Sequence, residues 1–169
     1  HPTQALLDAM TLRDALGTLE GRKIAIVGDI AHSRVARSNL HALTALGASV
    51  WLAGPPAWVR GFSGWPGVHV ADRLEDALEC ADAVMALRIQ LEREAGGGVP
   101  SLREYTARWG LDAARLQSAR PDAPVLHPGP TNEGIEITSE LAASERSLIG
   151  AQVVNGVAMR MAVLALLAQ

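Results

Sequence analysis

Short apolar runs alternate with amphipathic stretches along most of this chain. Five runs are typical of buried strands, at residues 23–28, 48–53, 68–70, 83–87 and 124–126. Between them, apolar residues recur every three or four positions, which indicates helices with one buried face, at about 34–46, 74–78, 102–109 and 112–119. Strands that alternate with helices at this spacing favour a doubly wound parallel sheet. We therefore predict an α/β fold, Rossmann-like, with five parallel strands in the order 3-2-1-4-5 and helices on both faces.

Helices are also expected at both ends of the chain. Pro2 suits a first helical turn, and apolar residues share one face after it, namely Ala5, Ala9, Leu12 and Leu16. Thr11 followed by Asp14 leaves open a second, short helix that begins there. A long apolar helix of about 150–168 closes the chain.

The composition is that of a globular protein, with 49% apolar and 20% charged residues. A net charge of −3 gives no electrostatic case for binding nucleic acid or an anionic membrane. The most apolar stretch, 153–168, carries Asn155 and Arg160 and is short for a membrane span. No signal peptide is visible, so we expect a cytoplasmic protein with no membrane or nucleic-acid partner. The one cysteine, Cys80, excludes an internal disulfide and is expected to be a small core residue.

Charged side chains follow the predicted strands at their carboxyl ends. Arg34 follows the first strand, Arg88 the fourth and His127 the fifth. In an open parallel sheet ligands bind at this edge, and the order 3-2-1-4-5 makes strands 1 and 4 neighbours. Because a guanidinium suits carboxylate or phosphate, the pattern predicts a crevice for a ligand with two negative groups. Alternation places Gln90 on the same side as Arg88. Alternatively, Arg34 is a solvated helix residue and Arg88 part of a salt-bridged surface loop.

Other candidate residues lie after the fifth strand and at the start of the chain. The rigid turn His127–Pro130 is suited to present backbone groups to a ligand, or it merely redirects the chain. His1 is placed to donate to a carbonyl oxygen, with Gln4 in the same helical turn. Glu133 and Glu136 are interpreted as local backbone or salt-bridge partners rather than an acid/base pair.

Several kinds of site are not indicated. The chain has neither Gly-x-Gly-x-x-Gly nor a Walker motif, so NAD or ATP binding is not expected. His32, His41 and His69 lack metal-ligand spacing, and neither Gly-x-Ser-x-Gly nor a Cys–His pair appears. We predict no cofactor and no metal.

Five ordered segments together resemble the second half of aspartate carbamoyltransferase. They are HPTQALLD at 1–8, VGDIAHSRVARSN at 27–39, MALRIQLER at 85–93, HPGPTNEGIEI at 127–137 and QVVNGVAMRM at 152–161. Each segment is modest by itself, but five in order across the whole chain are a specific signal. The family joins carbamoyl phosphate to L-aspartate and forms N-carbamoyl-L-aspartate and phosphate, in de novo pyrimidine biosynthesis.

The resemblance implies a role for each candidate residue. Arg34 and Arg88, assisted by Gln90, would bind the two carboxylates of aspartate. The carbamoyl phosphate contacts would come from His1, Gln4 and the backbone of Pro128 and Gly129. His1 would be catalytic, as a donor that polarises the carbonyl group and stabilises the developing oxyanion.

The resemblance also implies a domain organisation and partners. Residues 1–17 would lead from a carbamoyl phosphate domain that lies before His1, residues 18–149 would be the aspartate-binding domain, and residues 150–169 would return toward the other domain. The family implies a homotrimer of full-length chains, and regulatory or dihydroorotase partner chains are left open. We expect negligible turnover by this chain alone.

Two alternatives stay open. Ornithine carbamoyltransferase shares the fold and the His-Pro-x-Gln motif, but it typically carries a His-Cys-Leu-Pro turn suited to a cationic side chain. The His127-Pro-Gly-Pro turn and a second arginine, Arg88, favour an anionic acceptor instead. The other alternative is a non-catalytic assembly domain, against which the retained residues Arg34, Arg88, Gln90 and His1 argue.

Overall fold

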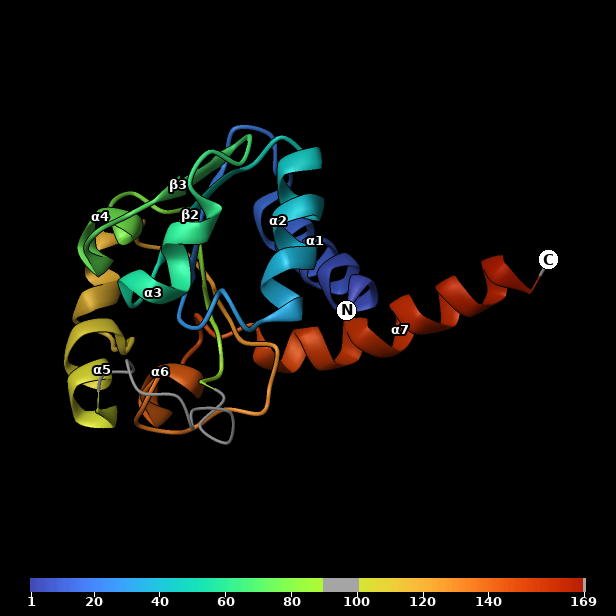
Figure 1. Ribbon diagram of the computed structural model, residues 1–169. Coiled ribbons are helices and arrows are strands. Elements are labelled where there is room, and N and C mark those ends of the chain that lie inside the picture. The colour runs from blue at the N-terminus through green and yellow to red at the C-terminus, as the bar shows by residue number, and fades with distance from the viewer. Residues whose placement is uncertain (90–100, 169) are drawn as a thin grey trace.

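One parallel sheet organises the molecule, as seen in a computed structural model that describes residues 1–89 and 101–168 (Figure 1). The strand order is β3-β2-β1-β4-β5. The strands are β1 Lys23–Val27, β2 Ser49–Ala53, β3 Val68–Val70, β4 Ala83–Ala86 and β5 Val125–Leu126. The predicted fold class, strand order and parallel pairing are therefore confirmed.

The helices connect the strands and close both ends of the chain. They are α1 Pro2–Leu16, α2 Arg34–Ala45, α3 Pro56–Val59, α4 Leu74–Leu78, α5 Leu102–Trp109, α6 Ser139–Ala142 and α7 Ile149–Leu167, with 3-10 turns η1 Arg60–Phe62 and η3 Arg115–Ser118. The second short helix considered at Thr11 is wrong, because α1 is continuous and Thr11 Oγ1 donates to Leu7 O within it (2.8 Å). The helix expected over 112–119 is reduced to the single turn η3.

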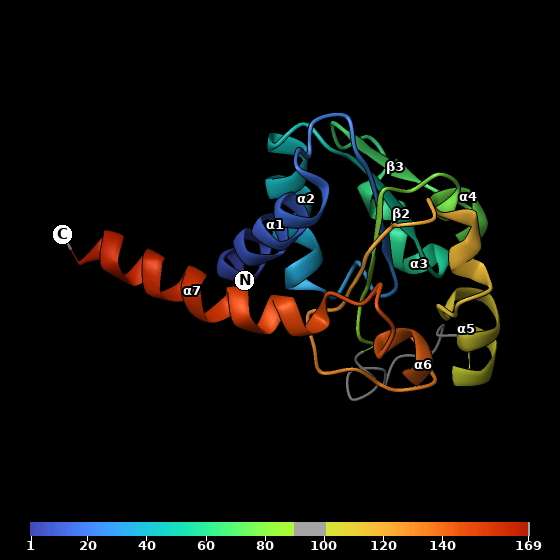
Figure 2. The same ribbon diagram turned by 180° about the vertical axis from the view of Figure 1, so that it is seen from behind.

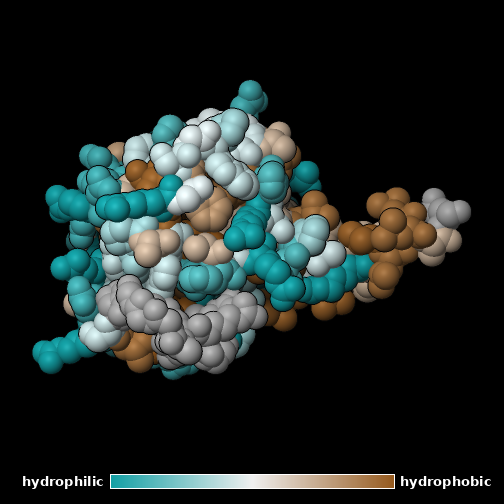
Figure 3. All heavy atoms as spheres, in the orientation of Figure 1, coloured by the Kyte–Doolittle hydropathy of each residue, from teal (hydrophilic) through white to brown (hydrophobic). Residues whose placement is uncertain are grey.

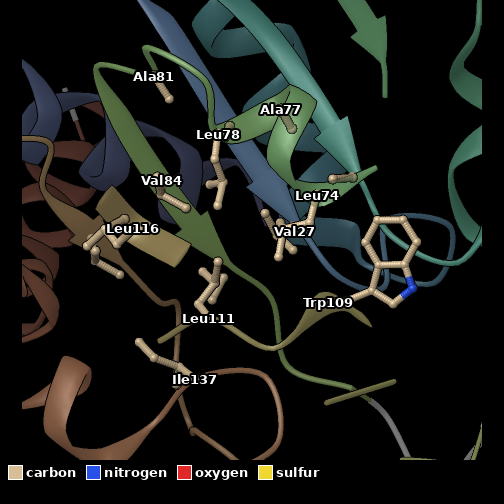
Figure 4. Close-up of a cluster of buried hydrophobic side chains, with 14 of the residues drawn as sticks. Val27, Leu74, Ala77, Leu78, Ala81, Val84, Trp109, Leu111, Leu116 and Ile137 are labelled. Carbon is tan, nitrogen blue, oxygen red and sulfur yellow. The ribbon is translucent and has the colours of Figure 1, made fainter. Parts of the chain in front are cut away.

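The strands present alternate residues to two hydrophobic clusters, one on each face of the sheet. Ile24 and Ile26 of β1 pack into the cluster that contains Leu12 of α1 and Leu40 of α2. Ala25 and Val27 face the opposite cluster, which is built with α4, α5 and the segment after β5. Figure 4 shows this second cluster, in which Val27 lies close to Leu74 of α4. The period of two in a β-strand produces this division, and helices on both faces are confirmed.

Helix α7 extends away from the body of the molecule (Figures 1 and 2). Only Gln152 and Gly156 of this helix are buried. Seven large apolar side chains of α7 are exposed, namely Val153, Val154, Val157, Met161, Leu164, Leu166 and Leu167. The outer part of the helix is the protruding hydrophobic arm in Figure 3. By length and composition alone its 19 residues are enough to cross a bilayer, so the expectation that this stretch is too short for a span is wrong. One such helix is weak evidence for a membrane protein.

Cys80 is exposed, and its expected place in the core is wrong. It lies in the turn between α4 and β4 with a φ of 54°, and its backbone N–H donates to Ser118 O (2.9 Å). The left-handed conformation turns the side chain outward, and the next residue, Ala81, is the one that enters the core.

Candidate functional site

The candidate site lies at the carboxyl edge of β1, β4 and β5. In the sheet, Val27 of β1 pairs with Ala86 of β4, and Met85 of β4 pairs with Leu126 of β5. The three strands therefore end at nearly the same level, and a candidate residue follows each one: Arg34 after a loop, Arg88 after Leu87 and His127 directly. This is the edge at which open α/β sheets bind ligands.

The loop between β1 and α2 positions Arg34. Asp29 Oδ1 accepts hydrogen bonds from the backbone N–H of His32 (3.1 Å) and from its Nδ1 (2.8 Å), which holds the loop in a turn. Ser33 then caps α2, because its Oγ accepts from Ala36 N (3.0 Å). Arg34 is the first residue of α2 and its side chain is exposed, so its guanidinium is accessible to a ligand at this edge.

The loop begins at Gly28, where the segments that follow β1, β2 and β4 approach one another closely. Gly28 has a φ of +126°, and a Cβ there would lie 2.9 Å from Leu87 O. A Cβ on Gly54, which follows β2, would overlap Gly28 O. Both positions therefore require glycine.

Arg88 follows β4 after Leu87 and is half-buried. The residue before it is fixed to β1, since Leu87 N donates to Val27 O (2.8 Å). The residue after it is fixed to the loop that follows β5, since Asn132 Nδ2 donates to Ile89 O (3.1 Å). The two arginines thus lie at the ends of neighbouring strands, as predicted, whereas Gln90 lies outside the described residues.

His127 is buried and holds the turn after β5 rather than facing the crevice. Its Nδ1 accepts from Gly129 N (2.9 Å), so the ring proton is on Nε2, which donates to Glu136 Oε1 (3.2 Å). His127 therefore does not offer a ligand, beside the two arginines, the free ring nitrogen expected from the sequence, although the residue lines a hollow together with Pro128 and Gly129. The same Glu136 oxygen accepts from Asn132 N (2.6 Å).

The interpretation as a local backbone or salt-bridge partner is confirmed for Glu136, whereas Glu133 bonds to a side-chain hydroxyl. Glu136 is buried and accepts from His127 and Asn132, and Glu133 Oε2 accepts from Ser139 Oγ (2.9 Å). Burial also raises the pKa of the phenol of Tyr105, and the charges of Glu136 and Asp29 raise it further. Tyr105 is therefore a neutral phenol at this edge of the sheet.

Gln4 comes close to the turn after β5. Gln4, Pro128 and Gly129 line one hollow of about 260 Å³, together with Gln152 and Arg160 of α7. The structure therefore brings together three of the four residues predicted to contact carbamoyl phosphate. His1, the fourth, is exposed at the N-terminus of α1, where its carbonyl oxygen accepts from Gln4 N (3.1 Å). A larger hollow of about 450 Å³, beside Met10 of α1, contains none of the predicted site residues.

A buried carboxylate beneath Gln4 was missed by the sequence reasoning. Asp8 of α1 is fully buried and accepts hydrogen bonds from Gln4, Asn39 and Gln152. Burial raises the pKa of Asp8, and the three amide hydrogen bonds oppose that shift. The one signal in the sequence is a carboxylate that stands between the apolar residues Leu7 and Ala9 of α1.

Among residues 1–89 and 101–168, no group of three or more His, Cys, Asp or Glu side chains is placed to hold a metal ion.

Comparison with known proteins gives concordant results in sequence and structure. The family described as “Aspartate/ornithine carbamoyltransferase, Asp/Orn binding domain” matches residues 20–167. The aspartate carbamoyltransferase catalytic subunit of Gluconacetobacter diazotrophicus is 57% identical over 169 residues, which are 100% of this chain and 53% of that protein. The catalytic subunit of Thermus aquaticus is 59% identical over 164 residues, which are 97% of this chain and 54% of that protein.

Solved structures of two related enzymes superpose well. Ornithine carbamoyltransferase from Thermus thermophilus has a TM-score of 0.86 at 27% identity, covering 100% of this chain and 56% of that one. Aspartate transcarbamoylase from Trypanosoma cruzi in complex with N-(phosphonacetyl)-L-aspartic acid has a TM-score of 0.81 at 31% identity, covering 97% and 55%. The chain spans about half the length of the curated relatives it matches.

Proposed function

The chain belongs to the aspartate/ornithine carbamoyltransferase family, through its Asp/Orn-binding domain, and on this basis we propose that it is the aspartate-binding part of an aspartate carbamoyltransferase. The whole enzyme would transfer the carbamoyl group of carbamoyl phosphate to L-aspartate and release phosphate. The observation that carries the proposal is the pair Arg34 and Arg88, which follow the neighbouring strands β1 and β4 at one edge of the sheet.

The two arginines would bind the two carboxylates of aspartate. Each guanidinium offers paired N–H donors that match a carboxylate. Arg34 is held by the capped start of α2, and Arg88 by backbone bonds on both sides of it. The expected assistance from Gln90 concerns a residue outside the described part of the chain and stays a prediction.

Gln4 and the backbone of Pro128 and Gly129 would contact the carbamoyl group, since they line one hollow. The amine of aspartate attacks the carbonyl carbon, and the carbonyl oxygen gains negative charge. His1 would donate a hydrogen bond to that oxygen, and collapse of the intermediate would expel phosphate, which would take up the proton that the amine loses. Such a reaction depends on orientation of the two reactants and on stabilisation of the developing charge.

Ornithine is the competing acceptor, because ornithine carbamoyltransferases are among the structures with high TM-scores. Sequence favours aspartate: the aspartate carbamoyltransferase catalytic subunits of Gluconacetobacter diazotrophicus and Thermus aquaticus are 57% and 59% identical, whereas the Thermus thermophilus ornithine enzyme is 27% identical. A second arginine at the site also suits a diacid better than a cationic side chain.

A chimera tests the proposal directly. This chain would replace the matching part of the Thermus thermophilus aspartate carbamoyltransferase catalytic subunit, to which it is 58% identical. We expect the chimera to carbamoylate L-aspartate and to leave L-ornithine unchanged, with the parent subunit as control. Transfer to ornithine alone would contradict the choice of acceptor. A folded chimera that transfers to neither would favour the non-catalytic assembly domain.

Further properties belong to the proposal as expectations. Full-length chains would form a homotrimer in the cytoplasm, and this chain alone would have negligible turnover. The division into residues 1–17, 18–149 and 150–169 likewise stays a prediction.

A further inference from the structure

A group of polar side chains around Asp8 lies in the buried interior. This carboxylate is fully buried between three helices that come from distant parts of the sequence. Its Oδ1 accepts from Gln4 Nε2 of α1 (2.9 Å) and from Gln152 Nε2 of α7 (2.8 Å). Its Oδ2 accepts from Asn39 Nδ2 of α2 (2.8 Å).

A carboxylate fixes the orientation of every amide that is bonded to it. An ionised carboxylate only accepts hydrogen bonds, whereas an amide side chain has a donor end and an acceptor end. Each amide bonded to Asp8 must therefore turn its nitrogen toward the carboxylate and its oxygen away. For Gln152, the oxygen turned away accepts from His127 N (2.9 Å), so Asp8 also fixes the start of the turn after β5.

Asp8 fixes the orientation of the Gln4 amide in the same way, at the wall of the hollow. Its nitrogen is bound to Asp8, and its side chain lines the hollow together with Pro128 and Gly129. The carbonyl oxygen of the Gln4 amide is therefore the end that is left for a ligand. A carbamoyl group presents an NH2 donor, and an amide oxygen is a matching acceptor.

We infer that Asp8 is a positioning residue, which holds the Gln4 amide with its oxygen available to the NH2 of the carbamoyl group and ties this orientation through Gln152 to the His127–Gly129 turn. The inference rests on the proposed function and deepens it. Asp8 does not touch the substrate. By orienting Gln4, Asp8 makes the site favour a ligand group that donates a hydrogen bond to the Gln4 oxygen over a group that accepts one.

Substitutions at Asp8 and its neighbours separate amide orientation from simple stability. Asp8→Asn is the matched control, because the new amide nitrogen has a place to go. It can face Asn39 once the Asn39 amide turns over, because Asn39 Oδ1 is buried and accepts no hydrogen bond from the described residues, whereas Nδ2 now donates to Asp8. The remaining oxygen at position 8 still accepts from Gln4 and Gln152, so the Gln4 orientation is kept.

Adding Gln152→Glu to Asp8→Asn reverses the Gln4 amide. A carboxylate at position 152 still accepts from His127 N, but it now requires a donor from position 8. The asparagine nitrogen must therefore turn toward it and away from Asn39. The same nitrogen faces Gln4, whose amide must turn over and present its NH2 to the hollow. Adding Gln4→Glu as a third change places a carboxylate at position 4. One of its oxygens accepts from the asparagine nitrogen at position 8, and the other again presents an acceptor to the hollow.

The chimera described above gives the kinetic readout. We expect kcat/KM for carbamoyl phosphate to fall at least about tenfold from Asp8→Asn to the double variant, since two donors then face each other. The triple variant should recover most of that loss, at unchanged thermal midpoint and with a smaller effect on KM for aspartate. A double variant as active as the control, or a triple variant without recovery, would overturn the inference.

A second readout does not depend on activity. In the 15N-labelled chain, one side-chain amide proton of Gln4 should exchange slowly with solvent, because it is bonded to a buried carboxylate. This protection should persist in Asp8→Asn and disappear in the double variant. Fast exchange in the unsubstituted chain would overturn the inference about Asp8 even if the chimera is active. An inactive chimera with a protected Gln4 amide would reject the proposed function alone.

Discussion

At the residue scale, the burial of Asp8 has a consequence for stability. The folded state raises the pKa of Asp8 by desolvation, and the hydrogen bonds from Asn39, Gln152 and Gln4 offset this only in part. In the unfolded chain the group titrates near the ordinary value of about 3.9. Between that pH and the raised folded pKa, the folded state binds more protons than the unfolded state. Stability from this group therefore falls as pH rises through that window.

Asp8→Asn should remove this pH dependence. We expect the variant to gain stability relative to the unsubstituted chain as the pH is raised from about 4, because only the latter must ionise a buried group. Urea unfolding at a series of pH values measures the difference. A difference that is constant with pH, or that shifts in favour of the unsubstituted chain, would contradict the assigned direction of the pKa shift.

The sequence could place the arginines but not the polar network. Arg34 and Arg88 follow strands that an apolar pattern identifies, and the strand order then makes them neighbours. Asp8, Asn39 and Gln152 instead meet because three helices pack together, and nothing local marks them as partners. His127 was misplaced for a related reason, since its partner Glu136 lies beyond a turn whose path the residue pattern does not fix.

At the element scale, the cap on α2 connects a local sequence signal to the site. Ser33 Oγ accepts from Ala36 N, and Arg34 is the next residue along the helix. Ser33→Ala should lower the free energy of unfolding by about 1 kcal/mol, whereas Ser33→Gly, the matched control, should cost only a few tenths. Denaturant unfolding measures both. Equal losses for the two variants would mean that the cap does not stabilise α2.

Helix boundaries were predictable where a hydrophobic face sets them, and less so where side chains compete for the backbone. The bounds of α5 match the predicted 102–109. The next predicted helix is only the turn η3, because Asp112 Oδ1 accepts from Arg115 N and the Arg115 guanidinium bonds to carbonyls at the end of α5. These hydrogen bonds fold the segment back onto α5, and helix propensity does not predict such tertiary contacts.

At the scale of the whole molecule, the strand order and the two-sided core followed from the alternation of strands and helices. The exposure of α7 did not. An apolar helix is normally buried, yet in α7 only Gln152 and Gly156 are, and its outer part projects from the body (Figure 3). The apolar pattern of α7 therefore predicted burial that the described residues do not provide.

The central claim is that Arg34 and Arg88 hold the two carboxylates of one aspartate. Calorimetry on the chimera with N-(phosphonacetyl)-L-aspartate tests it, with phosphonoacetamide, which lacks the aspartate part, as the control ligand. Arg34→Met and Arg88→Met should each weaken the binding of N-(phosphonacetyl)-L-aspartate by about 10- to 100-fold, the effect of a lost charged hydrogen bond. The affinity for phosphonoacetamide should stay unchanged. Unchanged affinity for the first ligand, or equal losses for both, would contradict the account.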